Sequence, residues 1–393
     1  MNRRQFLAAA ASSGIALALG ADAAEPKLRV AVIGHTGRGD YGHGLDTLWL
    51  ALPETEVVAV ADADAKGLAA AQKRLKLADG FSDYRKMLAQ TKPDIVAIGP
   101  RHIDQHRDMA LAAIESGARG IYMEKPFCRT PAEADEIVAA CEKRKTKFAL
   151  AHRNRYDPTL PVAARLVKEG RIGRLLEIRA RGKEDERGGA LDLWVLGSHA
   201  LNIAGFFAGA PLACSAVLLQ DGRPVTKADI REGAEGVGLL GGDELHARYE
   251  MESGVPVFFD SIKGAGNKAA NFGLQLIGVN GIIDIRIDTQ PLAHLIPGSP
   301  FLPAKEPRPW IPIGSAGAGE PEPIANVGNP VGSHALAARD LLAAIREDRA
   351  PLCSARDGRT IVEMICATFE SHRLGGARVP WPLATRRNAL ELM

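Results

Sequence analysis

The stretch LRVAVIGHTGRG occupies residues 28–39. Its first half, 28–33, is an apolar and β-branched run, which is typical of a strand covered on both faces in a parallel sheet. Its second half is a glycine-rich turn that follows the strand directly. We expect a helical segment at 45–50 and a second strand at 56–62. This order of strand, glycine-rich turn, helix and strand predicts an α/β domain with parallel strands.

The alternation of strands and helices continues to about residue 152. Three more strands are predicted at 94–98, 120–123 and 147–151, and three more helices at 66–77, 107–116 and 131–145. Such an arrangement is typical of a doubly wound α/β sheet of the Rossmann type. We therefore assign residues 25–152 to a Rossmann domain.

From about residue 153 the pattern changes from alternation to runs of strands. One helix is predicted at 160–169, followed by strands at 175–181, 213–219, 245–251, 255–262, 274–279 and 281–287. The Pro- and Gly-rich segment 291–330 is expected to be a long loop, and 334–348 and 359–372 are expected to be closing helices. Strands at short spacing predict a mostly antiparallel sheet with one helical face. We assign residues 153–393 to a C-terminal α+β domain with an open, mostly antiparallel sheet, whose last helices pack back.

The composition is that of an ordinary globular chain. Its 393 residues are 46% hydrophobic and 24% charged, which is enough material for two domains. Lys and Arg (49) nearly balance Asp and Glu (47), so the net charge of +2 gives no field that would recruit nucleic acid or an anionic membrane. The five cysteines and the scattered histidines show no metal-ligand spacing. We expect buried free thiols and no metal.

The first 24 residues are predicted to be a targeting segment. Residues 3–7 read Arg-Arg-Gln-Phe-Leu, a bland apolar run follows at 8–20, and 21–23 is an A-x-A cleavage pattern. This segment resembles a twin-arginine export signal. A frayed helix or a membrane anchor is the alternative, but the run is shorter than the ~20 strongly apolar residues that span a bilayer. We expect a periplasmic or exported protein with no stable membrane association after processing.

The glycine-rich turn is the expected site for the pyrophosphate of a dinucleotide, because backbone N–H groups and the positive end of a helix dipole meet there. The usual G-x-G-x-x-G fingerprint would need a glycine at position 36, where this chain has Thr36. Asp62 ends the second strand, where a carboxylate can bind the adenosine ribose hydroxyls and would repel a 2′-phosphate. NAD is therefore favoured over NADP. The cofactor residues predicted here are Gly34, His35, Thr36, Gly37, Arg38, Gly39 and Asp62.

Glu124-Lys125-Pro126 ends the fourth strand, at the edge where open parallel sheets bind ligands. Together with the glycine-rich turn, and with Pro100 and His106 after the third strand, this tripeptide resembles the glucose-fructose oxidoreductase/inositol dehydrogenase/MocA (Gfo/Idh/MocA) family. The resemblance runs from about residue 28 to near the C-terminus. It includes the stretch 153–158 and the tripeptide 197–199.

The resemblance implies an active site between the two domains. Lys125 would hydrogen-bond the reacting hydroxyl and help to place the nicotinamide, while His199 would accept or donate the proton. An imidazole suits this role, because hydride leaves a carbinol only as the O–H proton is removed. The further cofactor-binding residues that we infer are Pro100, His106, Glu124, Lys125 and Arg155.

The chain departs from the family on both sides of His199. Many members have an aspartate four residues before this histidine and an acid three residues after it, where this chain has Val195 and Asn202. Asp192 is the carboxylate that could replace them and is a third candidate catalytic residue, although a structural role is equally open. The charged run 179–187 could reach an acidic sugar, but a solvated strand edge is the favoured interpretation.

These features predict an NAD(P)-dependent oxidoreductase that transfers a hydride between nicotinamide and a sugar or polyol. The export signal favours an alternative, an NAD-dependent glycosidase or an aldose-aldose oxidoreductase that recycles tightly bound NAD. A non-catalytic dinucleotide- or sugar-binding protein is the third possibility, because a fold alone does not fix a function. An exposed sheet face would favour a homo-oligomer.

Overall fold

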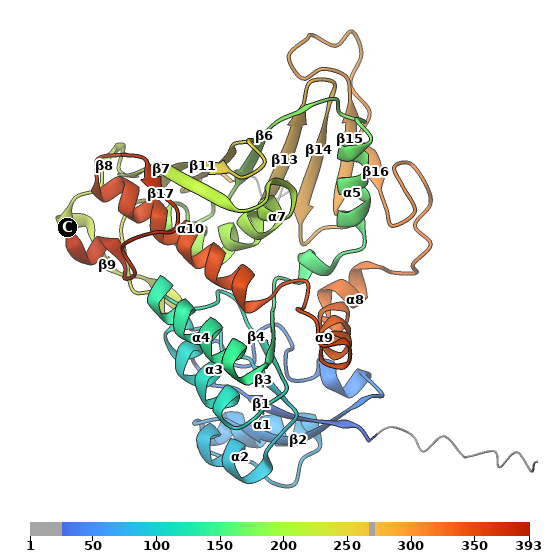
Figure 1. Ribbon diagram of the computed structural model, residues 1–393, viewed down its shortest axis with the longest axis vertical. Helices are drawn as coiled ribbons and strands as arrows, with labels where there is room; N and C mark the ends of the chain where they lie inside the picture. The colour runs from blue at the N-terminus through green and yellow to red at the C-terminus, as the bar shows by residue number, and fades with distance from the viewer. Residues whose placement is uncertain (1–25, 267–271) are drawn as a thin grey trace, which may run out of the picture.

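Five parallel strands form the first sheet of the computed structural model, in the order β2-β1-β3-β4-β5. The strands are β1 (Leu28–Ile33), β2 (Thr55–Ala61), β3 (Ile95–Ile98), β4 (Gly120–Met123) and β5 (Lys147–Leu150). Their side chains are almost entirely buried, because helices cover both faces, as a continuous apolar strand requires. These helices include α1 (Ala65–Leu75), α2 (Tyr84–Thr91), α3 (His106–Glu115) and α4 (Pro131–Arg144). The predicted Rossmann arrangement is confirmed (Figure 1).

The structure describes residues 26–266 and 272–393. The predicted export signal at 1–24 lies outside these residues.

The chain between β1 and β2 does not form the α-helix that the sequence predicts at 45–50. Positive φ angles recur along this segment, at Gly37, Gly39, Asp40, Gly42 and Gly44, and these angles are incompatible with a right-handed helix. The segment therefore runs as successive turns and ends in a short 3-10 helix, η1 (Leu48–Ala51). The prediction of an α-helix there was wrong, because the helix that forms is a 3-10 helix. The sequence pattern also gave no prediction for α2.

A second sheet of ten strands lies above the first. Its order is β16-β15-β14-β13-β6-β12-β11-β7-β17, with β8 paired to β7. The longer strands are β6 (Leu175–Arg181), β7 (Pro211–Gln220), β11 (Glu244–Met251), β12 (Val257–Ile262), β13 (Phe272–Gly278) and β14 (Gly281–Ile287). The pair β6–β12 is parallel, and the other pairs described in this sheet are antiparallel. The predicted mostly antiparallel sheet is confirmed.

The Pro- and Gly-rich segment 291–330 is more ordered than the predicted loop. It contributes β15 (Ala293–Pro297), β16 (Ile311–Ile313) and the short helix α8 (Gly328–Gly332). Pro312 lies in the edge strand β16, where a missing N–H is tolerated, and Pro297 is the last residue of β15. The sheet is consequently wider than the sequence pattern predicts.

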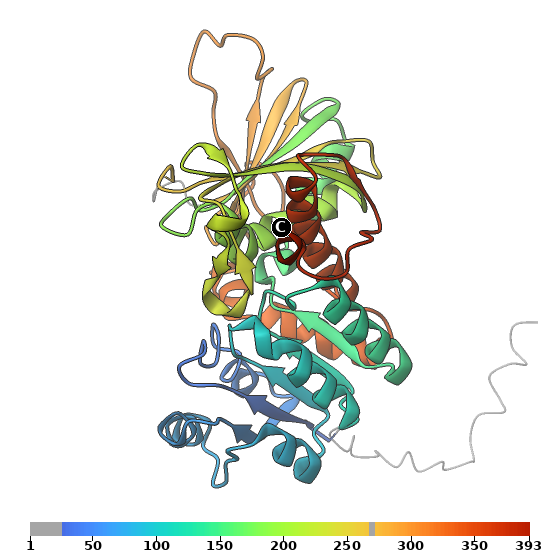
Figure 2. The ribbon, with the colours of Figure 1, turned by 90° about the vertical axis from the view of Figure 1, so that its left-hand side faces the viewer.

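Helices fill the space between the two sheets (Figure 2). A continuous helical run, Ala190–Ala208, consists of α6 (Ala190–Asp192), a π-helical segment η4 (Leu193–Gly197) and α7 (Ser198–Ala208). Within the described residues this is the one run long and apolar enough to cross a membrane, but it is largely buried, as a core helix of a globular protein is. It packs against β6, β12 and β13 and brings its π-helical segment toward the first sheet.

The C-terminal helices connect the two sheets. The helix α9 (Ala335–Glu347) packs on the strands β4 and β5 of the first sheet and on the 3-10 helix η1. The helix α10 (Ala355–Arg373) begins with a capping box between Ser354 and Asp357 and contacts both α4 and β7 (Figure 1). Residues more than 200 positions apart in the chain therefore share one hydrophobic core.

Replacing Leu341 in α9 by alanine should lower the free energy of unfolding by about 2–5 kcal/mol, the usual cost of a buried leucine cavity. Leu341 is fully buried. Urea denaturation followed by circular dichroism measures this loss. Leu352→Ala is the matched control, because Leu352 is 50% exposed. Equal losses for the two variants would contradict the docking of α9.

Candidate active site

Glu124 directly follows β4, and its side chain is fully buried. One carboxylate oxygen lies 3.2 Å from His43 Nδ1 and accepts a weaker bond from the His43 backbone N–H, while the other accepts from the Lys125 N–H. Burial raises the pKa of Glu124, but the His43 hydrogen bond and the nearby positive charges outweigh it and lower the pKa to about 2. Glu124 is therefore ionised and holds the turn after β1 against the end of β4.

Lys125 points across the gap between the two sheets. Its Nζ donates a 3.1 Å hydrogen bond to the backbone carbonyl of Val195, in the π-helical segment η4. Burial lowers the pKa of Lys125, whereas the charges of Glu124, Glu235 and Asp288 raise it. The missing acid at position 195 thus leaves Lys125 with a carbonyl oxygen as its partner.

His199 lies in the first turn of α7, and its Nδ1 is 3.3 Å from Nδ1 of His152. The two rings meet edge to face, with centroids 4.8 Å apart. Burial, together with His152 and the positive charge of Lys125, lowers the pKa of His199 well below its usual value, and burial lowers that of His152 to about 3. Both rings are therefore neutral near pH 7, and one donates to the other. Lys125 and His152 follow the adjacent strands β4 and β5, and Lys125 and His152 both contact the helical run that carries His199, so all three groups lie in one site.

The sequence interpretation missed His152 and its neighbour Arg153. His152 Nε2 is buried and has no hydrogen-bond partner among the described residues. Arg153 Nε pairs with Asp288 at 2.9 Å, and Asn154 donates to the same carboxylate oxygen at 2.7 Å. These residues directly follow β5, and the rule that ligands bind at the carboxyl ends of parallel strands could have identified them.

Arg155 packs against α7. Its guanidinium stacks on Phe206, 4.2 Å from the ring centroid, and lines a cavity of about 230 Å³ between α7 and α10. Asn202 lines the same cavity and donates to Cys353. Residues 202 and 155 therefore take part in the packing between α7 and α10, and the cofactor role of Arg155 stays a prediction.

The hydrogen bonds of Asp192 fit the structural role that the sequence left open, and a catalytic role stays a prediction. Its carboxylate accepts hydrogen bonds from the backbone N–H groups of Lys183 and Glu184 and from the hydroxyl of Ser261. The side chain is fully buried, and burial raises its pKa. With its oxygens already engaged, Asp192 anchors the loop after β6 to the helical run.

His106 and the carbonyl of Pro100 hold two loops together. His106 is fully buried, and its Nε2 lies 2.7 Å from the carbonyl oxygen of Pro100. Its Nδ1 lies 2.7 Å from the carbonyl oxygen of Pro126. This histidine therefore ties the loop after β3 to the loop after β4, and its assignment to the cofactor site stays a prediction.

Asp62 organises the glycine-rich turn. Its carboxylate accepts hydrogen bonds from the Thr36 N–H and hydroxyl, from Tyr41 Oη at 2.9 Å and from the Asp64 N–H. These donors occupy the lone pairs that the prediction reserved for ribose hydroxyls. Asp62 is 1% exposed and fixes Thr36 and Tyr41, and its contact with the adenosine ribose stays a prediction.

A cavity of about 390 Å³ nevertheless opens at the carboxyl ends of β1 and β2. The residues that line it include Gly34, His35, Asp62, Ser82, Asp83, Tyr84, Arg85, Gln105 and Met109. Beside it, a Cβ added to Gly37 would meet no atom within 4 Å, so the backbone there is open to a close approach. Arg38 pairs with Asp104 at 2.5 Å and keeps a buried Nε without a partner among the described residues. A concave site beside an arginine fits the adenosine and pyrophosphate of a dinucleotide.

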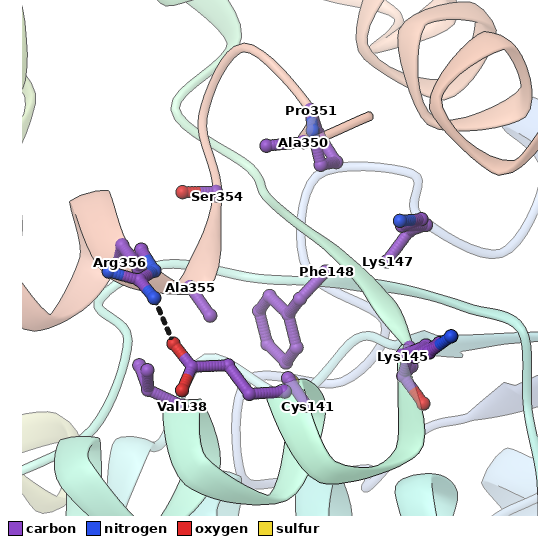
Figure 3. Close-up of a pocket in the computed structure, with 12 residues that line it drawn as sticks. Val138, Cys141, Lys145, Lys147, Phe148, Ala350, Pro351, Ser354, Ala355 and Arg356 are labelled. Atoms are coloured by element: carbon purple, nitrogen blue, oxygen red, sulfur yellow. Dashed lines mark hydrogen bonds and ion pairs between the residues drawn. The ribbon is translucent and has the colours of Figure 1, made fainter. Parts of the chain in front are cut away.

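Another pocket, of about 310 Å³, lies between α4, β5 and the start of α10 (Figure 3). The ring of Phe148 and the Glu142–Arg356 ion pair lie along its wall. Lys125, His152 and His199 are not among its lining residues, so it is separate from the candidate site. Among the residues described, no group of three His, Cys, Asp or Glu side chains could hold a metal ion.

Comparison with known proteins agrees with this geometry. Residues 28–152 match the Gfo/Idh/MocA family, described as an oxidoreductase family with an NAD-binding Rossmann fold. These residues form a Gfo/Idh/MocA domain. The Gfo/Idh/MocA domain accounts for the first sheet, and the family pattern ends just before the strand-rich second half.

Two curated relatives are sugar dehydrogenases by name. D-apiose dehydrogenase of Paraburkholderia graminis is 30% identical over 125 residues, which are 32% of this chain and 33% of the relative. Levoglucosan dehydrogenase of Pseudarthrobacter phenanthrenivorans is 27% identical over 258 residues, which are 59% of this chain and 65% of the relative. The matched region therefore spans less than two thirds of each relative's length.

Solved structures share the fold over nearly the whole chain. Levoglucosan dehydrogenase in complex with NADH and levoglucosan superposes with a TM-score of 0.71 and 21% identity, over 91% of this chain and all of the other. An NAD-binding oxidoreductase of Klebsiella pneumoniae gives a TM-score of 0.68 at 19% identity, over 90% of this chain and 99% of the other. Identities this low establish the two-sheet fold alone.

Replacing Asp62 by asparagine should weaken NAD binding at least about tenfold, because a charged acceptor of several hydrogen bonds is lost and the glycine-rich turn loosens. Nicotinamide fluorescence titration with NADH measures the dissociation constant. Asp79→Asn is the control, because Asp79 is exposed and lies outside the cavity. Unchanged affinity in Asp62→Asn would contradict the organising role.

Proposed function

We propose that the protein is an NAD-dependent oxidoreductase that transfers a hydride between nicotinamide and a carbon of a sugar or polyol. The observation that carries this proposal is the convergence of Lys125, His152 and His199, through their contacts and adjacent strands, beside a Gfo/Idh/MocA domain. The sugar class is supported by the names of the two curated relatives. NAD is preferred over NADP, because the cavity is lined by the carboxylate of Asp62.

Lys125 binds and orients the reacting hydroxyl. Its Nζ has three donor hydrogens, and the Val195 carbonyl accepts one of them. A remaining N–H can donate to the substrate oxygen and stabilise the negative charge that develops as the O–H proton leaves. Burial of Lys125 strengthens this interaction, because water is excluded from the charge.

His199 holds and moves the proton. Its low pKa keeps the ring neutral, so one nitrogen is free to accept the hydroxyl proton. The Nδ1 contact with His152 fixes the orientation of the His199 ring. Bound NAD would supply the hydride acceptor at the nicotinamide C4. In the reverse direction the same imidazole returns the proton to the carbonyl oxygen.

The mature protein should oxidise at least one member of a panel of aldoses, anhydrosugars and polyols with NAD, as followed by absorbance of NADH. Lys125→Met and His199→Asn should each lower kcat about 10²- to 10⁴-fold, the usual contribution of a positioned acid or base. Lys143→Ala is the control, because Lys143 is exposed on α4.

The pH profile gives an independent check on His199. Because its pKa is lowered, protonation of His199 should reduce kcat/KM only well below pH 6.5. An acidic limb at or above pH 6.5 that disappears in His199→Asn would contradict the buried neutral imidazole.

Turnover of NAD bound to the purified protein, without added cofactor, would instead favour the glycosidase or aldose-aldose alternative. If the purified protein neither contains nor binds a dinucleotide, the result would favour a non-catalytic role.

We also propose export through the twin-arginine pathway and assembly into a homo-oligomer. The arginine pair at 3–4 and the A-x-A pattern at 21–23 support export. The second sheet has helices on the side toward the first sheet, which leaves its other face for a second copy (Figure 2). Replacing both arginines by lysine should retain a tagged full-length chain in the cytoplasm, as measured by fractionation, and continued export would contradict the signal.

A further inference from the structure

The active site contains one acid that the proposed chemistry does not yet use. Three carboxylates raise the pKa of Lys125 by their charge, namely Glu124, Glu235 and Asp288. Glu124 is held by His43, and Asp288 is held by Arg153 and Asn154. Glu235 makes no hydrogen bond or ion pair with any described residue. It is therefore the one of the three whose oxygens are free for a ligand.

A hairpin of the second unit carries Glu235 to the first sheet. The hairpin consists of β9 (Arg231–Glu232), the turn η6 (Ala234–Gly236) and β10 (Leu239–Leu240). Its turn packs on η2 (Ile103–Gln105), which follows β3, and a Cβ added to Gly236 would lie 2.5 Å from Asp104 Oδ1 (Figure 2). The hairpin consequently covers the carboxyl edge of the Rossmann sheet.

The backbone at Glu235 is strained and held in place. Its φ is 57° and its ψ is 22°, in the left-handed region, which a non-glycine residue occupies at a free-energy cost. The neighbouring β10 is fixed by a 2.7 Å hydrogen bond from Asn388 to the Leu239 carbonyl. Strain of this kind persists where surrounding contacts enforce it, and it gathers at ligand sites. The partly buried Glu235 side chain is thus presented beside η2 at the carboxyl edge of the Rossmann sheet, from where its charge acts on Lys125 and His102.

We propose that Glu235 determines substrate specificity by accepting a hydrogen bond from a sugar hydroxyl next to the one that Lys125 holds. This inference rests on the proposed function. A carboxylate accepts hydrogen bonds and donates none, so it selects a ligand that carries hydroxyl donors. It supplies from the hairpin the acid that positions 195 and 202 lack, since Asn202 lines the cavity behind the site and Asp192 is engaged by backbone amides.

Glu235→Gln tests this role with little change in shape. The variant should raise KM for the sugar at least about tenfold, as expected when a charged acceptor is lost, while the dissociation constant for NADH stays unchanged. Glu232→Gln is the matched control, because Glu232 is exposed on the same hairpin. A weaker NADH affinity with an unchanged sugar KM would assign Glu235 to the cofactor and overturn the proposal, as would no change in either.

A second readout does not depend on turnover. Removing the charge of Glu235 should move the pH midpoint for acylation of Lys125, measured by peptide mass spectrometry, to a lower pH. The other charged groups acting on Lys125 are Glu124, Asp288 and Arg101, and none of them changes in this variant. An unchanged midpoint would overturn the placement of Glu235. If the wild-type protein oxidises no sugar but the midpoint moves, the proposed function fails while the placement of Glu235 stands.

Discussion

Glu124 and Lys125 place two opposite charges side by side in the interior, at the junction of the two sheets. A buried charge is costly unless it is paired and hydrogen-bonded, so each must be satisfied by its surroundings. Glu124 is satisfied by the turn after β1, and Lys125 by the carbonyl of Val195 in the second unit. The interaction of Lys125 with Val195 therefore depends on the helical run of the second unit being close to β4, and the rest of the site is built around this contact.

The strands and most helices could be predicted from the sequence, because their patterns are local. Residues 28–33 are apolar without interruption and form a buried strand, and 131–145 has a threonine cap and a proline at its start and forms α4. The prediction of an α-helix at 45–50 failed, because the backbone angles that matter there do not follow from a local pattern. The apolar spacing of the segment is helical, but the preceding glycines and Asp40 adopt positive φ angles that no periodicity reveals.

The candidate site was predictable only where a motif marked it. Lys125 was found from Glu-Lys-Pro, whereas His152 has no such motif and becomes visible through its 3.3 Å contact with His199. Asp192, Arg155 and Asp62 illustrate a different limit. A polar residue of the right type can be engaged by nearby backbone and side-chain groups, and its spacing does not tell whether its charge faces a ligand or the protein. Three-dimensional contacts decide this question.

The helix α10 touches both α4 and β7, and α9 lies on the first sheet after the chain has left the second. The polypeptide thus passes between the two units more than once, and the 19-residue helix α10 packs against both of them. Hinge-like domain closure needs a few flexible crossings, and this architecture opposes it. We expect the two units to keep a fixed separation during turnover. Substrate would then enter and leave without a rotation of one unit against the other.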